Sequence, residues 1–423
     1  MTTSRRSASA QPSERLGLQT DPSGRGRSRS RDSASRGRGA PLLRLPAGRF
    51  TPPHCPNLDC PFYEPDPDWT YSLWGFYKAP SCRKPLRRWQ CRHCGRTFTA
   101  RTFAVTYWLH HWEIFAEIAA GSVAGSGIRQ MARSLGVAHA TVSRHLTRAA
   151  RCCLLRHAQL LQTAPVSEPI VVDGFETFEF SQYFPYHLNL AVGQNSWFIY
   201  HFTDSPLRRK GRMRPEQKAR RAELEERFGR PDPKAVQSGM LELLREIVRM
   251  SQPRSAPPPP EPRVLELHMD EHPAYPRAIR ELQRDLDGLS IRAVTTPSTD
   301  PRTRANKLFP VNLADLLLRH SGADHRRETI AYGKRRQSGM ERAAVHTVWR
   351  NWIKWRRENH PGETAAMAAG LLDRRWSWRE VFGRRLFPRE RELTRVWWGY
   401  YWRRVKTAAL GAHQTENRAK FAY

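Results

Sequence analysis

The fold of this chain is decided by residues 169–202, which read Pro169-Ile-Val-Val-Asp173, then Tyr186-His-Leu-Asn-Leu-Ala-Val192, then Trp197-Phe-Ile-Tyr-His-Phe202. Each run is rich in β-branched and aromatic residues, which favour strands. The segment Gly193-Gln-Asn-Ser196 supplies a turn between the second and third runs. We therefore predict three consecutive strands that begin a mixed sheet, with Asp173 closing the first strand.

Later segments extend this sheet. A fourth strand is predicted at Val264-Leu-Glu-Leu-His268, followed by Asp270 and by a helix from about Tyr275. The intervening residues 205–262 are highly charged, show helical leucine spacing near 241–248, and end in Pro257-Pro-Pro-Pro260, which favours an extended linker. We interpret 205–262 as an insertion in the sheet domain. Another long helix is predicted from about residue 340 to residue 357.

The charge of the chain indicates the class of its partner. The 423 residues include 71 Lys+Arg against 40 Asp+Glu, a formal net charge of +31 that is spread along the sequence. A polyanion is the natural partner of such a chain. No apolar run is long enough to span a bilayer, and the N-terminus has no signal-peptide pattern, so we expect a cytoplasmic, nucleoid-associated protein without a membrane partner.

The N-terminal segment has its own composition. Residues 1–48 are rich in Arg, Ser, Gly and Pro and contain too few apolar residues to form a core. We expect a disordered basic arm. Its arginines either bind phosphates without sequence preference or serve only to solvate the tail.

Four cysteines in two close pairs indicate a metal site. Cys55 and Cys60 form the first pair, and Cys91 and Cys94 form the second. Short loops of this kind turn two thiolates toward one tetrahedral ion, so we predict a structural zinc ribbon over residues 49–104. Four sulfur ligands leave no open position for chemistry. The alternatives are buried thiols without metal, or substitution of one sulfur by the neighbouring histidines at 54 and 93.

A helix-turn-helix pattern follows at residues 127–146. Gly136 suits a tight turn, Ala132 allows close helix crossing, and apolar residues at 128, 135, 142 and 146 supply a shared core. We predict a helical DNA-binding domain over residues 105–165, with an ordinary helical hairpin as the alternative. The residues expected to point outward from the second helix and contact DNA are His139, Thr141, Ser143, Arg144 and Arg148.

Three acids are candidates for a second metal site. Asp173 and Asp270 each follow a predicted strand, and Glu341 lies at helical spacing from Val345 and Val348, which turns it toward the core. Carboxylates are the preferred ligands of Mg²⁺ or Mn²⁺, the ions that support phosphodiester chemistry. The alternatives are that both aspartates only cap turns, and that Glu341 closes a capping box with Ser338.

This order of modules resembles the DDE-class transposases of bacterial insertion sequences. Beyond the modules, the stretch from Asn306-Lys-Leu-Phe-Pro-Val-Asn312 to Arg335-Arg-Gln-Ser-Gly-Met-Glu-Arg342 and Trp349-Arg-Asn-Trp352 is similar to the C-terminal part of such proteins. The resemblance covers about residues 50–423. It implies that Asp173, Asp270 and Glu341 are catalytic and bind magnesium. Because 70 residues separate the last two acids, Asp315 and Glu328 remain alternatives for the third.

The resemblance also completes the expected organisation. It implies an α+β multidomain chain in which a ribonuclease-H-like mixed α/β catalytic domain spans residues 166–360 and a basic aromatic region spans 361–423, where we expect most tryptophans to be core residues. The implied activity is metal-dependent cleavage and strand transfer of double-stranded DNA by a homo-oligomer, with residues 334–336 contacting phosphates. The alternatives are a non-catalytic DNA-binding regulator and a nuclease or resolvase of the same fold.

Overall fold

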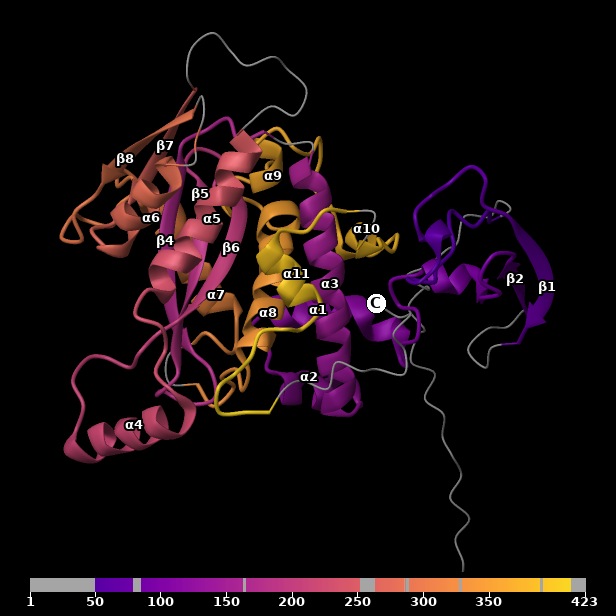
Figure 1. Cartoon of the computed structure of the whole chain (residues 1–423), viewed down its shortest axis with the longest axis horizontal. Coiled ribbons are helices and arrows are strands. Elements are labelled where there is room, and N and C mark those ends of the chain that lie inside the picture. The colour runs from indigo at the N-terminus through magenta and orange to yellow at the C-terminus, as the bar shows by residue number, and fades with distance from the viewer. Residues whose placement is uncertain are drawn as a thin grey trace, which may run out of the picture. The chain divides into compact units, whose positions relative to one another are not determined.

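The computed structural model describes residues 50–78, 85–162, 165–251, 263–284, 286, 289–326, 329–388 and 391–411. The expected basic arm at 1–48, the prolines at 257–260 and the alternative acid Glu328 lie outside these residues. Within the described part, the fold is mixed α/β with two separate sheets (Figure 1). No helix in this part is both long and apolar enough to cross a lipid bilayer.

The first sheet is a small antiparallel meander that follows the first cysteine pair. Its strands are β1 (Tyr71–Tyr77), β2 (Leu86–Cys91) and β3 (Thr97–Thr99), flanked by the short helices η1 (Pro61–Tyr63) and η2 (Ala100–Phe103). Its core contains Trp69, Trp89 and Phe98 packed with the buried sulfurs of Cys55 and Cys91. A core of so few apolar side chains contributes little stability. A module of this size needs further stabilisation, such as a bound metal.

Three helices follow over the residues of the predicted helix-turn-helix pattern. They are α1 (Phe115–Val123), α2 (Ile128–Leu135) and α3 (His139–Gln162), preceded by η3 (Trp112–Ile114). Helix α2 ends at Gly136, whose φ of 66° is left-handed and favours glycine. A small core of Ile118, Met131, Ala132, Val142 and Leu146 joins the three helices. The predicted glycine turn and the predicted close approach at Ala132 are both present.

The second sheet has the strand order β6-β5-β4-β7-β8. Its strands are β4 (Ile170–Phe178), β5 (Pro185–Gly193), β6 (Ile199–Pro206), β7 (Arg263–Met269) and β8 (Leu289–Thr295). The first three form an antiparallel meander, whereas β7 joins β4 in parallel and β8 joins β7 in parallel. The three predicted consecutive strands and the predicted fourth strand are therefore found in one mixed sheet.

Helices cover both faces of this sheet. They are α4 (Pro215–Phe228), α5 (Ala235–Ser251), α6 (Ala274–Gln283), α7 (Phe309–Ser321), α8 (Arg336–Val348), η4 (Trp349–Ile353), α9 (Ala365–Ala368), α10 (Trp378–Val381) and α11 (Arg395–Tyr401). Thr203 donates to the carbonyl of Gly239 in α5, while the ring of neighbouring Phe202 lies 5.2 Å from that of Trp397 in α11. Successive strand residues point to opposite faces, so α5 and α11 lie on opposite sides.

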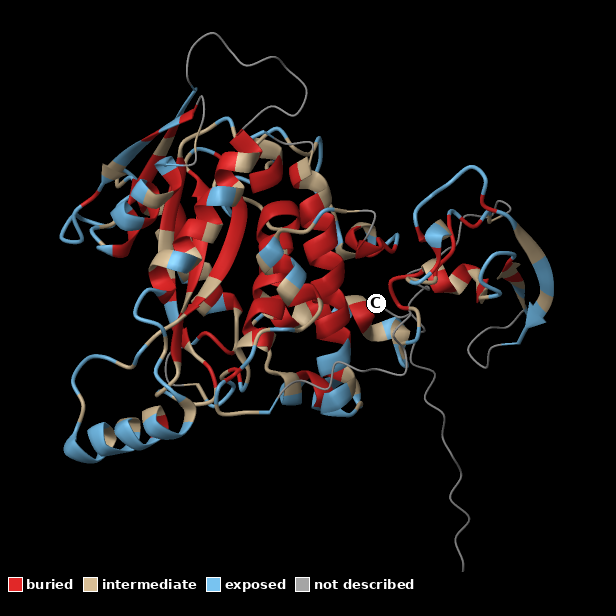
Figure 2. Cartoon of the chain, viewed as in Figure 1, coloured by how far each residue is buried: buried red, intermediate tan, exposed pale blue. Residues whose placement is uncertain are grey.

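Two sequence predictions need correction. Strand β4 does not end at Asp173, because residues 174–178 continue its ladder with β5. Within the segment interpreted as an insertion, α4 is mostly exposed, whereas α5 has an apolar face that is buried in the core (Figure 2). The helix expected over 340–357 begins at Arg336 and passes into a π-helical turn at 349–353.

One core joins segments that were expected to form separate domains. The buried cluster around the second sheet includes Phe115 of α1, Leu154 and Leu155 of α3, and Trp397 of α11. Helices α3 and α8 run side by side in Figure 1 and pack on each other. The boundaries predicted near residues 165 and 360 therefore do not separate independent cores. Of the C-terminal tryptophans that were expected to be mainly core, Trp397 is buried and Trp398 is exposed. Trp376, Trp378 and Trp402 are half-buried and packed against the core.

Candidate metal centres

The four predicted cysteines lie close together. One ligand atom from each of Cys55, Cys60, Cys91 and Cys94 can be chosen so that all lie within 4.8 Å of one another, and this is the only such group of three or more His, Cys, Asp or Glu among the described residues. Neither neighbouring histidine belongs to the group. The arrangement is compatible with a zinc site, as the paired spacing predicted.

The surroundings of the cysteines stabilise a thiolate at one position. Burial opposes ionisation of Cys91, but backbone N–H groups of Cys94 and His93 and the indole N–H of Trp69, 3.3 Å from its sulfur, lower the pKa of Cys91 to about 7. Burial raises the pKa of Cys60 to about 11. Cysteine thiols release their protons when they bind a metal cation, and the lowered pKa of Cys91 eases this step at that ligand. The cluster is therefore suited to metal binding.

The second sheet brings two of the three predicted acids together. Ile170 and Val171 of β4 pair in parallel with Leu267 and His268 of β7. Asp173 lies two residues further along β4, and Asp270 directly follows the end of β7. The charge of Asp270 acts on Asp173 and raises its pKa, so the two carboxylates are near one another. Asp173 Oδ1 accepts from the Gly174 N–H at 2.6 Å, and Asp270 Oδ1 accepts from the His272 N–H at 2.9 Å.

A third acid, Asp315, approaches this pair from helix α7. The helix packs on β4 and β5, with Val311, Ala314 and Leu318 buried against the sheet. Asp315 is next to this buried face, and its Oδ1 is buried without a hydrogen-bond partner. An unpartnered buried carboxylate oxygen is costly unless a cation or a proton compensates it. Asp315 is thus a described acid whose environment favours a cation or a proton at its carboxylate.

The ionisation of these acids shows that they are coupled. Burial, and then the charge of Asp270, raise the pKa of Asp173 to about 6. Burial and the nearby Asp173 raise the pKa of Asp315 well above its usual value, although Arg319 and Arg302 act in the opposite direction. Like charges in a desolvated place raise one another's pKa. The carboxylates are not all within 4.8 Å of one another, so a shared ion would require them to rotate inward.

The predicted third acid, Glu341, is in a different network. It is buried, as its helical spacing predicted, but its carboxylate accepts from Arg403 Nε at 2.8 Å, from Thr147 at 3.0 Å and from Gln337 at 3.2 Å. The capping box with Ser338 is not formed either. The contacts of Glu341 join α8 to α3 and to the C-terminal segment, and none of the described contacts links it to the two aspartates.

Several groups beside the acids were not predicted. Tyr275 of α6 points its hydroxyl at Asp173 Oδ1, 3.4 Å away. The exposed Arg302 contributes positive charge that lowers the pKa of both Asp173 and Asp315. A sequence signal existed for Asp315, which lies four residues after Val311 and so borders an apolar helix face. No comparable signal existed for Arg302, which is in a loop.

The basic residues expected beside Glu341 have structural partners. Arg336 forms an ion pair with Asp204 at 2.8 Å and lies 3.6 Å from Glu179. Arg335 donates to the carbonyl of Gly411, and Lys334 lies over the ring of Tyr332. Phosphate contacts from Arg336 would therefore require it to break two ion pairs.

The predicted DNA-contacting residues of α3 divide into two groups. His139, Ser143 and Arg144 are exposed, and Thr141 is half-buried. The expectation that Arg148 points outward is wrong, because it is 8% exposed and donates to the carbonyls of Val105 and Tyr107. After its first two helical turns, α3 packs into the main core, so most of its later side chains are buried.

Comparison with known proteins adds no family assignment. No protein-family model matches this sequence, and no curated protein is similar to it.

Proposed function

We propose that this protein is a DNA transposase that cleaves and joins DNA with divalent cations held by Asp173, Asp270 and Asp315. The observation that carries the proposal is that Asp173 lies on β4 and Asp270 directly follows the neighbouring parallel strand β7, while Asp315 on the adjoining helix α7 has a buried, unpartnered carboxylate oxygen. This replaces Glu341 by Asp315, an alternative that the sequence had left open.

The donor set fits the metal that the chemistry needs. Carboxylate oxygens are hard ligands suited to Mg²⁺ or Mn²⁺, and no sulfur lies among the three acids. The raised pKa values reflect burial first, and then repulsion by Asp270 at Asp173 and by Asp173 at Asp315, which a divalent cation would offset. When bound, such ions supply a nucleophilic hydroxide and neutralise charge on the scissile phosphate.

The remaining groups have roles that follow from their positions. Tyr275 donates to Asp173 and so fixes the orientation of that carboxylate. Arg302 is exposed beside the acids and is placed to bind a phosphate of the DNA backbone. No covalent protein nucleophile is needed, because water and then a 3′-hydroxyl attack the phosphate.

The fold supports the same proposal at a coarser level. A mixed five-stranded sheet, with helices on both faces and acids near the point where β4 meets β7, supports a ribonuclease-H-like catalytic domain. The exposed start of α3 supports recognition of the element's ends in the major groove, and the net charge of +31 supports binding along the DNA backbone.

A strand-transfer assay tests the proposal against its two rivals. Purified protein is incubated with DNA from both flanks of its gene and a target plasmid, with and without Mg²⁺. We expect Mg²⁺-dependent nicks at the element ends and joined products. Nicks without joining would favour a nuclease or resolvase, and binding without nicks would favour a DNA-binding regulator.

A further inference from the structure

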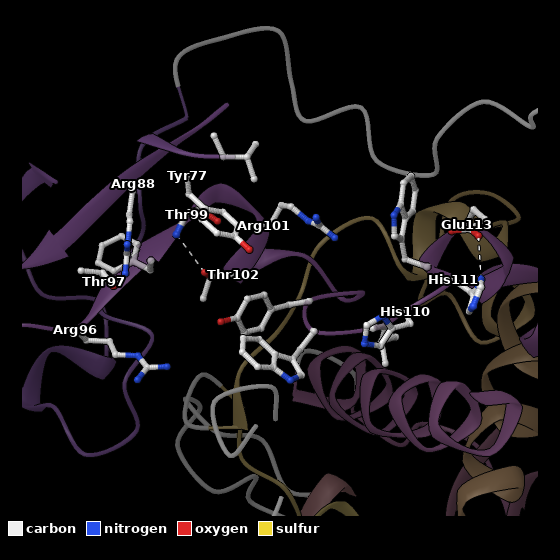
Figure 3. Close-up of a pocket in the computed structure, with 16 residues that line it drawn as sticks. Tyr77, Arg88, Arg96, Thr97, Thr99, Arg101, Thr102, His110, His111 and Glu113 are labelled. Carbon is white, nitrogen blue, oxygen red and sulfur yellow. Dashed lines mark hydrogen bonds and ion pairs between the residues drawn. The ribbon is translucent and has the colours of Figure 1, made fainter. Parts of the chain in front are cut away.

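A large cavity lies outside the acid site. It has a volume of about 850 Å³ and is lined entirely by residues between 77 and 113, which belong to β1, β2, β3, η2 and the segment leading to η3 (Figure 3). Ligand sites in proteins commonly have volumes of about 300–1,000 Å³. Its lining contains neither the four clustered cysteines nor any of the three acids of the proposed catalytic site.

One wall of the cavity is aromatic and has an unusual backbone. Trp108 is 65% exposed and has a φ of 65°, and His111 has a φ of 52°. Bulky residues rarely adopt this left-handed conformation, which costs on the order of 1–3 kcal/mol and persists only where the surrounding structure enforces it. Tyr107 lies beside Trp108 with their ring centroids 5.7 Å apart. The wall therefore presents an exposed indole on a backbone of unfavourable conformation.

Helix α3 holds this wall in place. Arg148 donates to the carbonyls of Val105 and Tyr107, and a ring nitrogen of His145 lies 3.1 Å from the carbonyl of His111. Arg144, which directly precedes His145 in α3, is exposed in the proposed DNA-reading turn. The same helix that would contact DNA through Arg144 therefore also supports the cavity wall through His145 and Arg148.

Three arginines also line the cavity. Arg88 and Arg96 come from the ribbon and Arg101 from η2, as Figure 3 shows, while Glu113 is the only acid in the lining. Glu113 lies 3.6 Å from His111. Arg88 is held by Thr97, to which it donates at 2.7 Å. The cavity thus offers flat apolar rings beside fixed positive charge.

We propose that this cavity holds an unpaired nucleotide of bound DNA, with its base against the rings of Tyr107 and Trp108 and its phosphate near Arg88 and Arg96. Bases stack on aromatic side chains, and guanidinium groups bind phosphates. A paired base within a duplex cannot enter a pocket, so the nucleotide must be extruded or single-stranded. The inference rests on the proposed function only in taking DNA as the partner.

The test compares two short fluorescein-labelled duplexes that are identical except for one unpaired thymine on one strand. Fluorescence anisotropy of each duplex with the full-length protein is measured at a single salt concentration, because phosphate contacts make affinity depend on salt. We expect the parent protein to bind the duplex with the unpaired thymine about tenfold more tightly, which is the size of one base–aromatic stacking contact.

Variants assign this preference to the cavity. Trp108→Ala should reduce the preference to about one while leaving affinity for the paired duplex unchanged, and Trp108→Phe, which keeps a ring, should retain most of it. Trp74→Ala is the matched control, because Trp74 is a similarly exposed indole on β1 outside the cavity lining. It should retain the full preference. Trp108 is largely exposed, so unfolding temperature and zinc content should match the parent.

Two results would overturn the inference: a parent protein that binds both duplexes equally, or a Trp108→Ala variant that keeps the preference. These results are separate from failure of the proposed function. A protein that prefers the unpaired thymine but never nicks DNA would retain the cavity assignment and lose the catalytic one. A protein that nicks without such a preference would do the reverse.

Discussion

At the scale of single residues, the site depends on which acid completes the set with Asp173 and Asp270. Asp315 has a buried oxygen without a partner and is coupled to Asp173, whereas Glu341 is neutralised by Arg403. A carboxylate already paired with a guanidinium is a poor ligand for a cation, because binding would break the ion pair. The two acids should therefore respond differently to the same chemical change.

Two isosteric substitutions separate these roles. We expect Asp315→Asn to lower Mg²⁺-dependent nicking on the order of a hundredfold or more while stability is retained or raised, because a neutral side chain relieves repulsion from Asp173. Glu341→Gln should leave nicking of the folded protein intact. It should lower the free energy of unfolding by roughly 2 kcal/mol, since Arg403 loses its partner but is partly exposed.

The measurements are nicking rates and urea unfolding of both variants, with the parent as reference. If Glu341→Gln abolishes nicking in a protein that remains folded, while Asp315→Asn is active, the third acid is Glu341 after all.

Asp173 also predicts a pH dependence of stability. Burial and Asp270 raise the pKa of Asp173 from 3.8 to about 6. A carboxyl group with a raised pKa binds more protons in the folded state, so its contribution is present below the unfolded pKa and is lost as pH rises through 6. In magnesium-free buffer, Asp173 alone should lower the free energy of unfolding by about 2 kcal/mol between pH 4 and pH 7.

Urea unfolding at several pH values, for the parent and for Asp173→Asn, isolates this contribution. Both proteins carry the same cysteine cluster, so any acid-dependent loss of zinc cancels in the comparison. Identical pH profiles for the two proteins would show that Asp173 has an ordinary pKa.

At the scale of elements, the cysteine module should depend on its metal. We expect Cys91→Ser to remove zinc and to unfold residues 50–104 while the second sheet stays folded, because the module's own core is small. Cys152→Ala is the control, since Cys152 is a buried cysteine of α3 outside the cluster. Metal analysis and limited proteolysis check both variants. A full zinc content in Cys91→Ser would contradict the ligand assignment.

Local patterns predicted most of the elements, and long-range packing explains what they missed. Alternation and turn residues were sufficient for β5 and for the Gly136 turn, because both depend on near neighbours. The end of β4 was missed, since Gly174 weakens the strand pattern and pairing with Asn189 of β5 restores it. The inward turn of Arg148 was missed because it depends on carbonyl groups 41 and 43 residues away.

The same distinction applies to the candidate site. Asp173 and Asp270 were identified because each is near a strand that the sequence marks clearly. The third acid was not, because Asp315 and Glu341 both border apolar helix faces and differ only in tertiary partners. Arg403, which neutralises Glu341, is 62 residues away in the sequence.

At the scale of the whole molecule, the proposed DNA-reading helix and the sheet that carries the proposed catalytic acids share one core. Helix α3 presents Arg144 to solvent at its start, and its later residues belong to the buried cluster around the second sheet. The net charge of +31 should make binding to any DNA strong at low salt and weak at high salt. Binding and chemistry must therefore be measured at the same salt concentration.

The central claim is that the acids cleave DNA that other parts of the protein bind. It is tested most directly by gel-shift binding and Mg²⁺-dependent nicking of the same flanking DNA, using Asp270→Asn and Arg144→Ala. Asp270→Asn keeps the side-chain shape and removes one ligand charge, so nicking should be abolished with binding largely unchanged. Arg144→Ala should weaken binding by about 1–3 kcal/mol if it contacts a base edge. An Asp270→Asn protein that nicks as fast as the parent would contradict the claim.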